Sequence, residues 1–175
     1  MARVPYLELP AGHRTTSNVA RALANSPKGS QKYSGIAMYL RFESTLDTRL
    51  RELAILQVGY VTRQIYEYAH HCSLALEYGC SEDDIRALAD DTAGKPTNLD
   101  PLTKHVLRAA RDMTTKMELS DETFAALKAA LSMEHLMDLL MAIASYNATV
   151  RMLNALKVDL EPEYQKYLEK FPLPK

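Results

Sequence analysis

Apolar residues recur along the chain at helical spacing, and the alternation typical of strands is scarce. Glycines and prolines gather at the breaks between these segments. The pattern predicts an all-α bundle of about seven or eight helices, built as one domain over residues 1–175. Residues 1–12 are expected to form an extended arm that could pack on a neighbouring subunit. Residues 158–175 are expected to form a polar tail with a short helix around 163–169.

Side chains that cap helices mark several of the predicted boundaries. Asp47 precedes one helix, and Ser120 and Ser132 precede two others. Ser81 with Asp84 three residues later forms a capping-box pattern that starts a further helix. The predicted helices cover residues 16–25, a segment ending at Phe42, residues 51–61, 64–79, a segment beginning after Ser81, and residues 102–116, 121–131 and 132–156.

The helix predicted over residues 132–156 is apolar on most of its faces. Such a helix is normally buried at the centre of a bundle or between subunits. One row of residues along this helix nevertheless carries Asn147, Arg151 and Asn154, whose polar groups need partners if they are buried. We expect Arg151 either to pair with a structural carboxylate, Glu52 being a candidate, or to bind an anionic ligand.

Composition excludes several classes of partner. The chain of 175 residues has 21 basic and 22 acidic residues, so no excess of charge indicates nucleic acid or an anionic membrane. The amino terminus lacks the apolar run of a signal peptide, and no later segment is predicted to span a bilayer. Cys72 and Cys80 are the only thiols and fit neither a disulfide framework nor a metal site. A cytoplasmic location is therefore expected.

The candidate chemistry lies in Glu67 and His71, which are four residues apart on one predicted helix. Neighbouring carboxylate and imidazole groups can tune an acid or a base to neutral pH. The same spacing is common on solvated helix surfaces, so a surface pair is the alternative. Periodicity places Cys72 on the apolar face as a small core residue. It does not decide which polar flank faces a pocket: one flank carries Gln64, Glu67, His71 and Tyr78, and the other carries Tyr66, His70, Ser73 and Glu77.

Segments 51–56, 64–71, 75–81 and 146–156 together resemble the carboxymuconolactone decarboxylase family. The superfamily of that family also contains the alkyl hydroperoxidase D proteins. The resemblance covers about residues 28–160 and implies an alkyl hydroperoxidase D-like helical bundle. It also implies a homo-oligomer, either a trimer or a dimer of trimers.

The hydroperoxidase branch carries a Cys-x-x-Cys pair, with a Glu twelve residues before the first Cys and a His four residues after the second. Aligned on Gly79, these positions fall on Glu52 and His71, and the two cysteines fall on Gln64 and Glu67. The thiol pair is absent, so dithiol peroxidase chemistry lacks its nucleophile. The decarboxylase branch is similar in having Glu and His at Glu67 and His71. The resemblance thus selects His71 as the site histidine and leaves the neighbouring histidine in solvent.

The resemblance implies an enzyme that carries out cofactor-free decarboxylation or proton transfer on a small carboxylated or lactone-type compound. Arg151 or Arg63 would hold a substrate carboxylate. The sequence shows no nucleotide loop and no metal-ligand cluster, so neither a cofactor nor a metal is implied. The catalytic residues expected are His71, Glu67 and Glu52, and the substrate-binding residues expected are Gln64, Tyr66, Tyr146, Asn147 and Arg151.

Two other functions remain open from the sequence. One is a ligand-binding or scaffold protein that keeps the fold without turnover, because a fold does not determine a function. The other, less favoured, is a peroxidase-like activity that uses Cys72 alone.

Overall fold

The computed structural model describes residues 1–10 and 15–174, and within them the regular structure is entirely helical. The predicted fold class is confirmed, and eight of the α-helices have seven or more residues. The elements are, in chain order, α1 (Asn18–Leu23), α2 (Pro27–Tyr33), α3 (Gly35–Phe42), α4 (Thr48–Val61), α5 (Ile65–Glu77), α6 (Glu82–Thr92), α7 (Pro101–Thr115), α8 (Asp121–Ala130), α9 (Met133–Leu156), the short 3-10 helix η1 (Pro162–Tyr164) and α10 (Gln165–Lys170).

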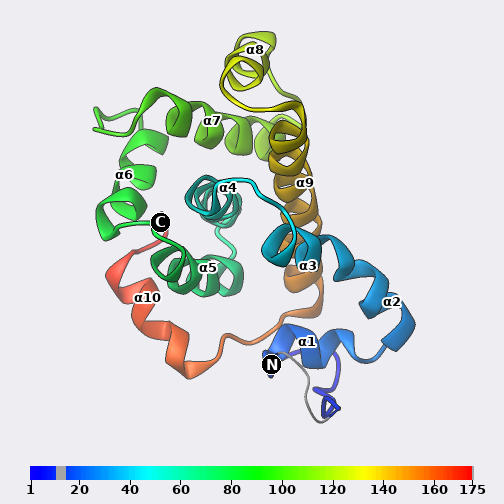
Figure 1. Cartoon of the computed structure of the whole chain (residues 1–175). Helices are drawn as coiled ribbons and strands as arrows, with labels where there is room; N and C mark the ends of the chain where they lie inside the picture. Colours follow the sequence, from blue (N-terminus) through cyan, green and yellow to red (C-terminus); the bar gives the residue numbers. More distant parts are fainter. Residues whose placement is uncertain (11–14, 175) are drawn as a thin grey trace.

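Helix α4 lies at the centre of the molecule, with α3, α5, α6, α7 and α9 around it (Figure 1). Every residue from 50 to 60 is buried, including Arg51, Glu52 and Gln57. A helix buried on all its faces contacts neighbours in every direction. The polar groups that α4 carries must therefore find partners inside the protein.

Helix α9 is not the central helix of the single chain. Its apolar residues Leu136, Leu139 and Ile143 are buried in the core, but Met133 and Met137 on another face are 56% and 48% exposed. The sequence predicted burial either within a bundle or between subunits. Within one chain, only part of that apolar surface is covered.

Capping side chains start the helices where the sequence predicts them. Asp47 accepts a hydrogen bond from the backbone N–H of Leu50, and Ser81 and Asp84 form the complete capping box of α6. Ser120 and Ser132 likewise accept from backbone N–H groups at the starts of α8 and α9. These bonds satisfy donors that a helix start would otherwise leave free.

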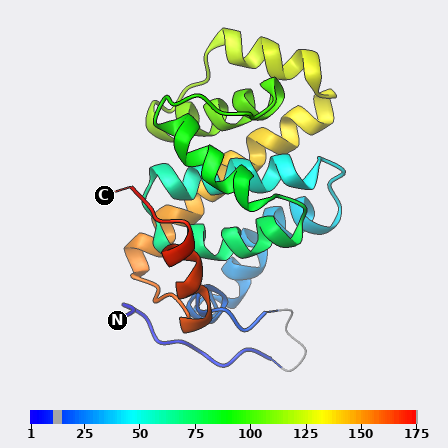
Figure 2. The same ribbon diagram turned by 90° about the vertical axis from the view of Figure 1, so that its left-hand side faces the viewer.

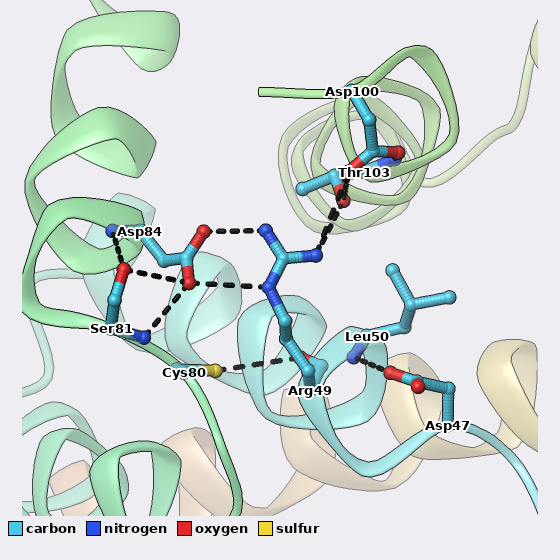
Figure 3. Close-up of polar contacts among 8 residues, drawn as sticks. All are labelled: Asp47, Arg49, Leu50, Cys80, Ser81, Asp84, Asp100 and Thr103. Atoms are coloured by element: carbon cyan, nitrogen blue, oxygen red, sulfur yellow. Dashed lines mark hydrogen bonds and ion pairs between the residues drawn. The ribbon is translucent and has the colours of Figure 1, made fainter. Parts of the chain in front are cut away.

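A network around Arg49 fixes the start of α4 against two other helices (Figure 3). The guanidinium of Arg49 forms an ion pair with Asp84 at the start of α6. Its Nη1 also donates to Thr103 Oγ1 of α7 at 3.0 Å and lies 3.6 Å from Asp100 Oδ2. Because Arg51 and Glu52 follow on the same helix, this network also fixes the backbone positions from which their side chains extend.

The two ends of the chain lie on the same side of the molecule (Figure 2), and the amino-terminal arm packs against the end of α9 and the residues that follow it. The N–H of Arg3 donates to the carbonyl of Leu156 at 2.8 Å, and the hydroxyl of Tyr6 donates to Asp159. The described part of the arm, residues 1–10, packs on its own chain, and residues 11 and 12 lie outside the described residues. Its packing on a neighbouring subunit stays a prediction. The carboxy-terminal segment is not simply a polar tail, because Val158 and Phe171 are buried.

The described part of the chain contains no helix long and apolar enough to cross a membrane.

Close contact between α4 and α5 depends on Gly59. A Cβ atom at this position would lie 3.2 Å from the backbone N, the Cα and the Cβ of Tyr68. Such a distance is tighter than ordinary packing, and two helices can approach this closely only where one of them lacks a side chain.

We therefore expect Gly59→Val to lower the free energy of unfolding by about 1–3 kcal/mol, because the branched side chain would force α4 and α5 apart. Chemical denaturation measures the change. Gly35→Val is the matched control, since a Cβ at Gly35 meets no atom within 4 Å. Equal stability of the two variants would contradict the close-contact account.

Candidate active site

The imidazole of His71 is held between two carboxylates. Its Nδ1 lies 2.6 Å from Oε2 of Glu52 on α4, and its Nε2 lies 2.9 Å from Oε1 of Glu67 on α5. All three residues are buried. The structure therefore brings together the three residues that the sequence selected as catalytic.

Local structure explains how Glu67 reaches His71. The two residues lie one turn apart on α5, where side chains at i and i+4 are neighbours. Glu67 stands in the first turn of the helix, and its backbone N–H donates to the side-chain Oε1 of Gln64, the N-cap residue, at 2.8 Å. A carboxylate in the first turn is also stabilised by the helix dipole.

Arg51 holds Glu52 from the other side. Its Nε and Nη2 donate to Glu52 Oε1 at 3.1 Å and 3.0 Å, and its Nη1 donates to the carbonyl of Leu40 at 2.8 Å. Both side chains are almost fully buried. Oε1 of Glu52 is thus committed to Arg51 and Oε2 to His71, which fixes the carboxylate in one orientation.

These contacts determine the protonation of the site. Burial alone would lower the pKa of His71, but the charges and hydrogen bonds of Glu52 and Glu67 outweigh it and raise the pKa to about 9. For Glu52, burial would raise the pKa, and His71 and Arg51 together lower it below its ordinary value. At neutral pH the centre therefore contains an imidazolium between carboxylates, rather than a neutral base.

A small cavity of about 60 Å³ adjoins His71, between α3, α4, α5 and α9, whose places are shown in Figure 1. The ring of Tyr146 on α9 meets the ring of His71 edge-on, with centroids 4.9 Å apart. The polar residues of the lining are Arg41, Arg51, Glu52, His71 and Tyr146, and the apolar residues are Ala37, Leu40, Ile55 and Leu74.

Four of the predicted substrate-binding residues do not line this cavity. Gln64 caps α5 and donates to Asn154, and Asn147 donates to Thr114 and to the carbonyl of Ile143. Arg151 is exposed and bonds to Asn147 of its own helix. The expected pairing of Arg151 with Glu52 is thus wrong, because Arg51 is the arginine that binds this carboxylate. Arg63, the other arginine considered, is exposed and also lies outside the lining.

Tyr66 and His70 belong to a separate cluster around Glu161. The hydroxyl of Tyr66 donates to Glu161 Oε1 at 2.9 Å, and His70 Nε2 lies 2.7 Å from Glu161 Oε2. The ring of His70 stacks between those of Tyr66 and Tyr164. The prediction that His70 lies in solvent is wrong, and Tyr66 faces this cluster instead of the cavity.

The two thiols are unsuited to nucleophilic chemistry. Cys72 and Cys80 are both buried, and burial raises the pKa of each to about 12. A thiolate is the reactive form of cysteine, so neither residue would be ionised at neutral pH. The prediction that Cys72 is a core residue is confirmed.

Sequence reasoning missed Arg41 and Arg51. Adjacent residues point in different directions on a helix, so the spacing rules gave no reason to pair Arg51 with Glu52. The long arginine side chain nevertheless folds back along α4 to reach its neighbour. No sequence signal identified Arg41, which reaches the cavity only because α3 packs beside α4 and α9.

Comparison with known proteins supports this fold. The model of the carboxymuconolactone decarboxylase family matches residues 27–112. This part of the chain is thus similar in sequence to the carboxymuconolactone decarboxylase family, and the chain has the fold of alkyl hydroperoxidase D-like proteins. No curated protein matches the chain in sequence.

Solved structures show the same fold at low sequence identity. A peroxidase-related protein with an alkylhydroperoxidase AhpD core, from Ralstonia eutropha JMP134, is 20% identical, with a TM-score of 0.75 and coverage of 99% of this chain and 98% of that one. A cysteine-to-alanine variant of the debrominase Bmp8 bound to 2,3,4-tribromopyrrole is 16% identical, with a TM-score of 0.76 and coverage of 87% and 81%. A peroxidase-related protein from Silicibacter sp. TM1040 is 17% identical, with a TM-score of 0.68 and coverage of 94% and 97%.

Because its pKa is raised on folding, His71 should make stability depend on pH. A histidine with a raised pKa stabilises the fold fully below its unfolded value near 6.5, and this contribution is lost as pH rises through about 9. Glu52, whose pKa is lowered, contributes above its unfolded value and loses that contribution as pH falls.

We therefore expect the free energy of unfolding to fall by up to about 3 kcal/mol between pH 6.5 and 9.5. His71→Asn should be less stable at pH 6.5 and should lack this decline. Urea denaturation at a series of pH values measures both curves. Parallel curves for the two proteins would show that His71 is not held as an imidazolium.

Proposed function

We propose that the chain is an enzyme that decarboxylates, or moves a proton on, a small carboxylated or lactone-type compound without a cofactor. The observation that carries the proposal is the His71 ring at the cavity wall, with one carboxylate bonded to each of its nitrogens. The match of residues 27–112 to the carboxymuconolactone decarboxylase family supports the reaction class. The family match concerns the class of protein, and the decarboxylation itself is what we propose.

In the proposed reaction, the bond between the substrate carbon and its carboxylate breaks and carbon dioxide leaves. The electron pair stays on the substrate as a dienolate and then takes up a proton. Leu40, Ile55 and Leu74 provide an apolar wall that keeps water from the departing carboxylate. This step needs no oxidant, because the substrate retains the electron pair.

His71 supplies the proton in this proposal. Both of its nitrogens are engaged and Glu67 does not line the cavity, so the proton reaches the substrate after the His71–Glu67 hydrogen bond opens. Glu52, fixed by Arg51, keeps the ring oriented and stabilises its charged form. Solvent then restores the proton to His71.

A ligand-binding protein without turnover is the second candidate. The observation that favours it is the same doubly bonded ring, since a histidine whose nitrogens both have partners can serve as a structural bridge between α4 and α5. A peroxidase is not supported, because Cys72 and Cys80 are buried and their pKa values are raised.

The proposed enzyme assembles as a homo-oligomer, a trimer or a dimer of trimers. The exposed apolar face of α9 supports this assembly, because Met133 and Met137 would lose contact with water at an interface. A stable monomer in sedimentation velocity at micromolar concentration would contradict it.

The activity test compares variants of two neighbouring histidines on carboxymuconolactone and related lactone acids, with carbon dioxide release as the readout. His71→Asn should lower the rate by roughly 10²-fold or more, because asparagine cannot exchange a proton near neutral pH. Glu67→Gln should lower the pKa of His71 and move the alkaline limb of the pH–rate profile to lower pH. Wild-type activity should decline as pH rises toward about 9.

His70→Asn is the matched control, since it removes an imidazole beside a carboxylate on the same helix but away from the cavity. It should change stability and leave the rate unchanged. Circular dichroism verifies that each variant is folded. Full activity in folded His71→Asn, or equal losses in both histidine variants, would refute the catalytic assignment.

A further inference from the structure

The cavity presents hydrogen-bond donors that have no acceptor. Both oxygens of Glu52 and both nitrogens of His71 are engaged with each other or with their neighbours, and each nitrogen of Arg51 has an acceptor. Among the described residues that line the cavity, this leaves the two Nη atoms of Arg41 and the hydroxyl of Tyr146 as uncommitted polar groups. The Nη groups of Arg41 can only donate, and the protonated hydroxyl of Tyr146 can donate as well as accept.

Contacts with Tyr78 hold Arg41 in place. Nε of Arg41 donates to the Tyr78 hydroxyl at 3.1 Å, and its Cζ lies 5.8 Å from the centroid of that ring. The Cζ of Arg51 lies 5.2 Å from the same centroid. Tyr78 thus contacts both guanidinium groups through cation–π interactions, and it leaves the Nη atoms of Arg41 available to a ligand.

Tyr146 is a second donor fixed at the cavity wall. Its ring packs edge-on against His71, and burial together with the nearby charges of Glu67 and Glu52 raises its pKa well above 10. The hydroxyl therefore keeps its proton. A phenol beside two carboxylates remains a donor for an incoming acceptor.

Arg41 is an exposed residue at the opening of the cavity, and it has no paired carboxylate among the described residues. Glu52 is paired with Arg51 and His71, and Glu67 is paired with His71. Within the described part of the chain, Arg41 has no carboxylate within ion-pair distance. Its two Nη atoms are therefore free to bind an anion that enters the cavity, and a carboxylate accepts from a guanidinium in two parallel bonds.

We propose that Arg41 and Tyr146 form a clamp for one carboxylate of a small compound with two carboxyl groups, the other being the one that leaves, and that the carbon chain next to the clamped carboxylate lies against Leu40, Ile55 and Leu74. The proposal deepens the proposed function and rests on it, because it places the substrate in the cavity beside His71. The clamp holds a carboxylate that is retained while the reacting carbon faces His71. Arg41 is then the residue that selects anionic over neutral ligands.

The size of the cavity limits the part of the substrate that it can enclose. Its volume of about 60 Å³ corresponds to roughly four water-sized probes. Propanoate fits this limit, and propanamide has nearly the same shape without the charge. Comparing the affinities of propanoate and propanamide therefore separates the contribution of charge to binding from that of size.

The experiment titrates the full-length protein with propanoate and with propanamide at constant ionic strength, and follows amide chemical shifts by NMR. Propanoate should bind at least tenfold more tightly than propanamide. Arg41→Gln should weaken propanoate binding tenfold or more, and Tyr146→Phe should weaken it several-fold, because hydrogen bonds to a charged group are the strong ones. Arg151→Gln is the control and should bind as the wild type does, since Arg151 lies outside the cavity lining.

Equal affinities for the two ligands, no binding of propanoate, or unchanged binding by folded Arg41→Gln would each overturn the clamp. Because propanoate is unreactive, its binding does not depend on turnover. If His71→Asn releases carbon dioxide at the full rate and still binds propanoate, the proposed function is wrong and the clamp stands. If Arg41→Gln binds propanoate as the wild type does while His71→Asn loses activity as expected, the clamp is wrong and the proposed function stands.

Discussion

The interaction on which the rest of the site depends is the imidazolium of His71 between Glu52 and Glu67. A buried charge is costly unless it is paired and hydrogen-bonded, so the two carboxylates and the ring stabilise one another only as a set. The set joins α4 to α5, and Arg51 extends it to the backbone of α3 at Leu40. Removing one member leaves the others with uncompensated charge, and for this reason structure and chemistry at this centre are coupled.

The surrounding fold supplies the geometry that this set requires. Gly59 allows α4 and α5 to approach closely, and the Arg49 network fixes the start of α4 against α6 and α7. Helices are suited to such a site because their side chains start from rigid positions. The cavity then forms where α3 and α9 meet this pair of helices, next to the ring that carries the proton.

Sequence reasoning predicted the helical fold, the capping residues and the three members of the His71 centre. Spacing within one helix identified Glu67 and His71 as a candidate pair, and the family resemblance selected His71 and added Glu52. Sequence reasoning failed where the partner of a side chain depends on how the helices pack. The partner of Glu52 proved to be the adjacent Arg51 rather than Arg151, and His70 pairs with Glu161, which lies ninety-one residues away in sequence. Neither contact follows a helical period, and Arg41 entered the cavity through tertiary packing alone.

The central claim is that His71 carries a proton on both ring nitrogens at physiological pH. Nitrogen-15 NMR of histidine-labelled protein at pH 7.5 tests it directly, since the chemical shifts of protonated and unprotonated ring nitrogens are well separated. The account predicts that Nδ1 and Nε2 of His71 are both protonated and that the ring titrates only near pH 9. One unprotonated nitrogen at pH 7.5, or titration near the ordinary value of 6.5, would contradict it.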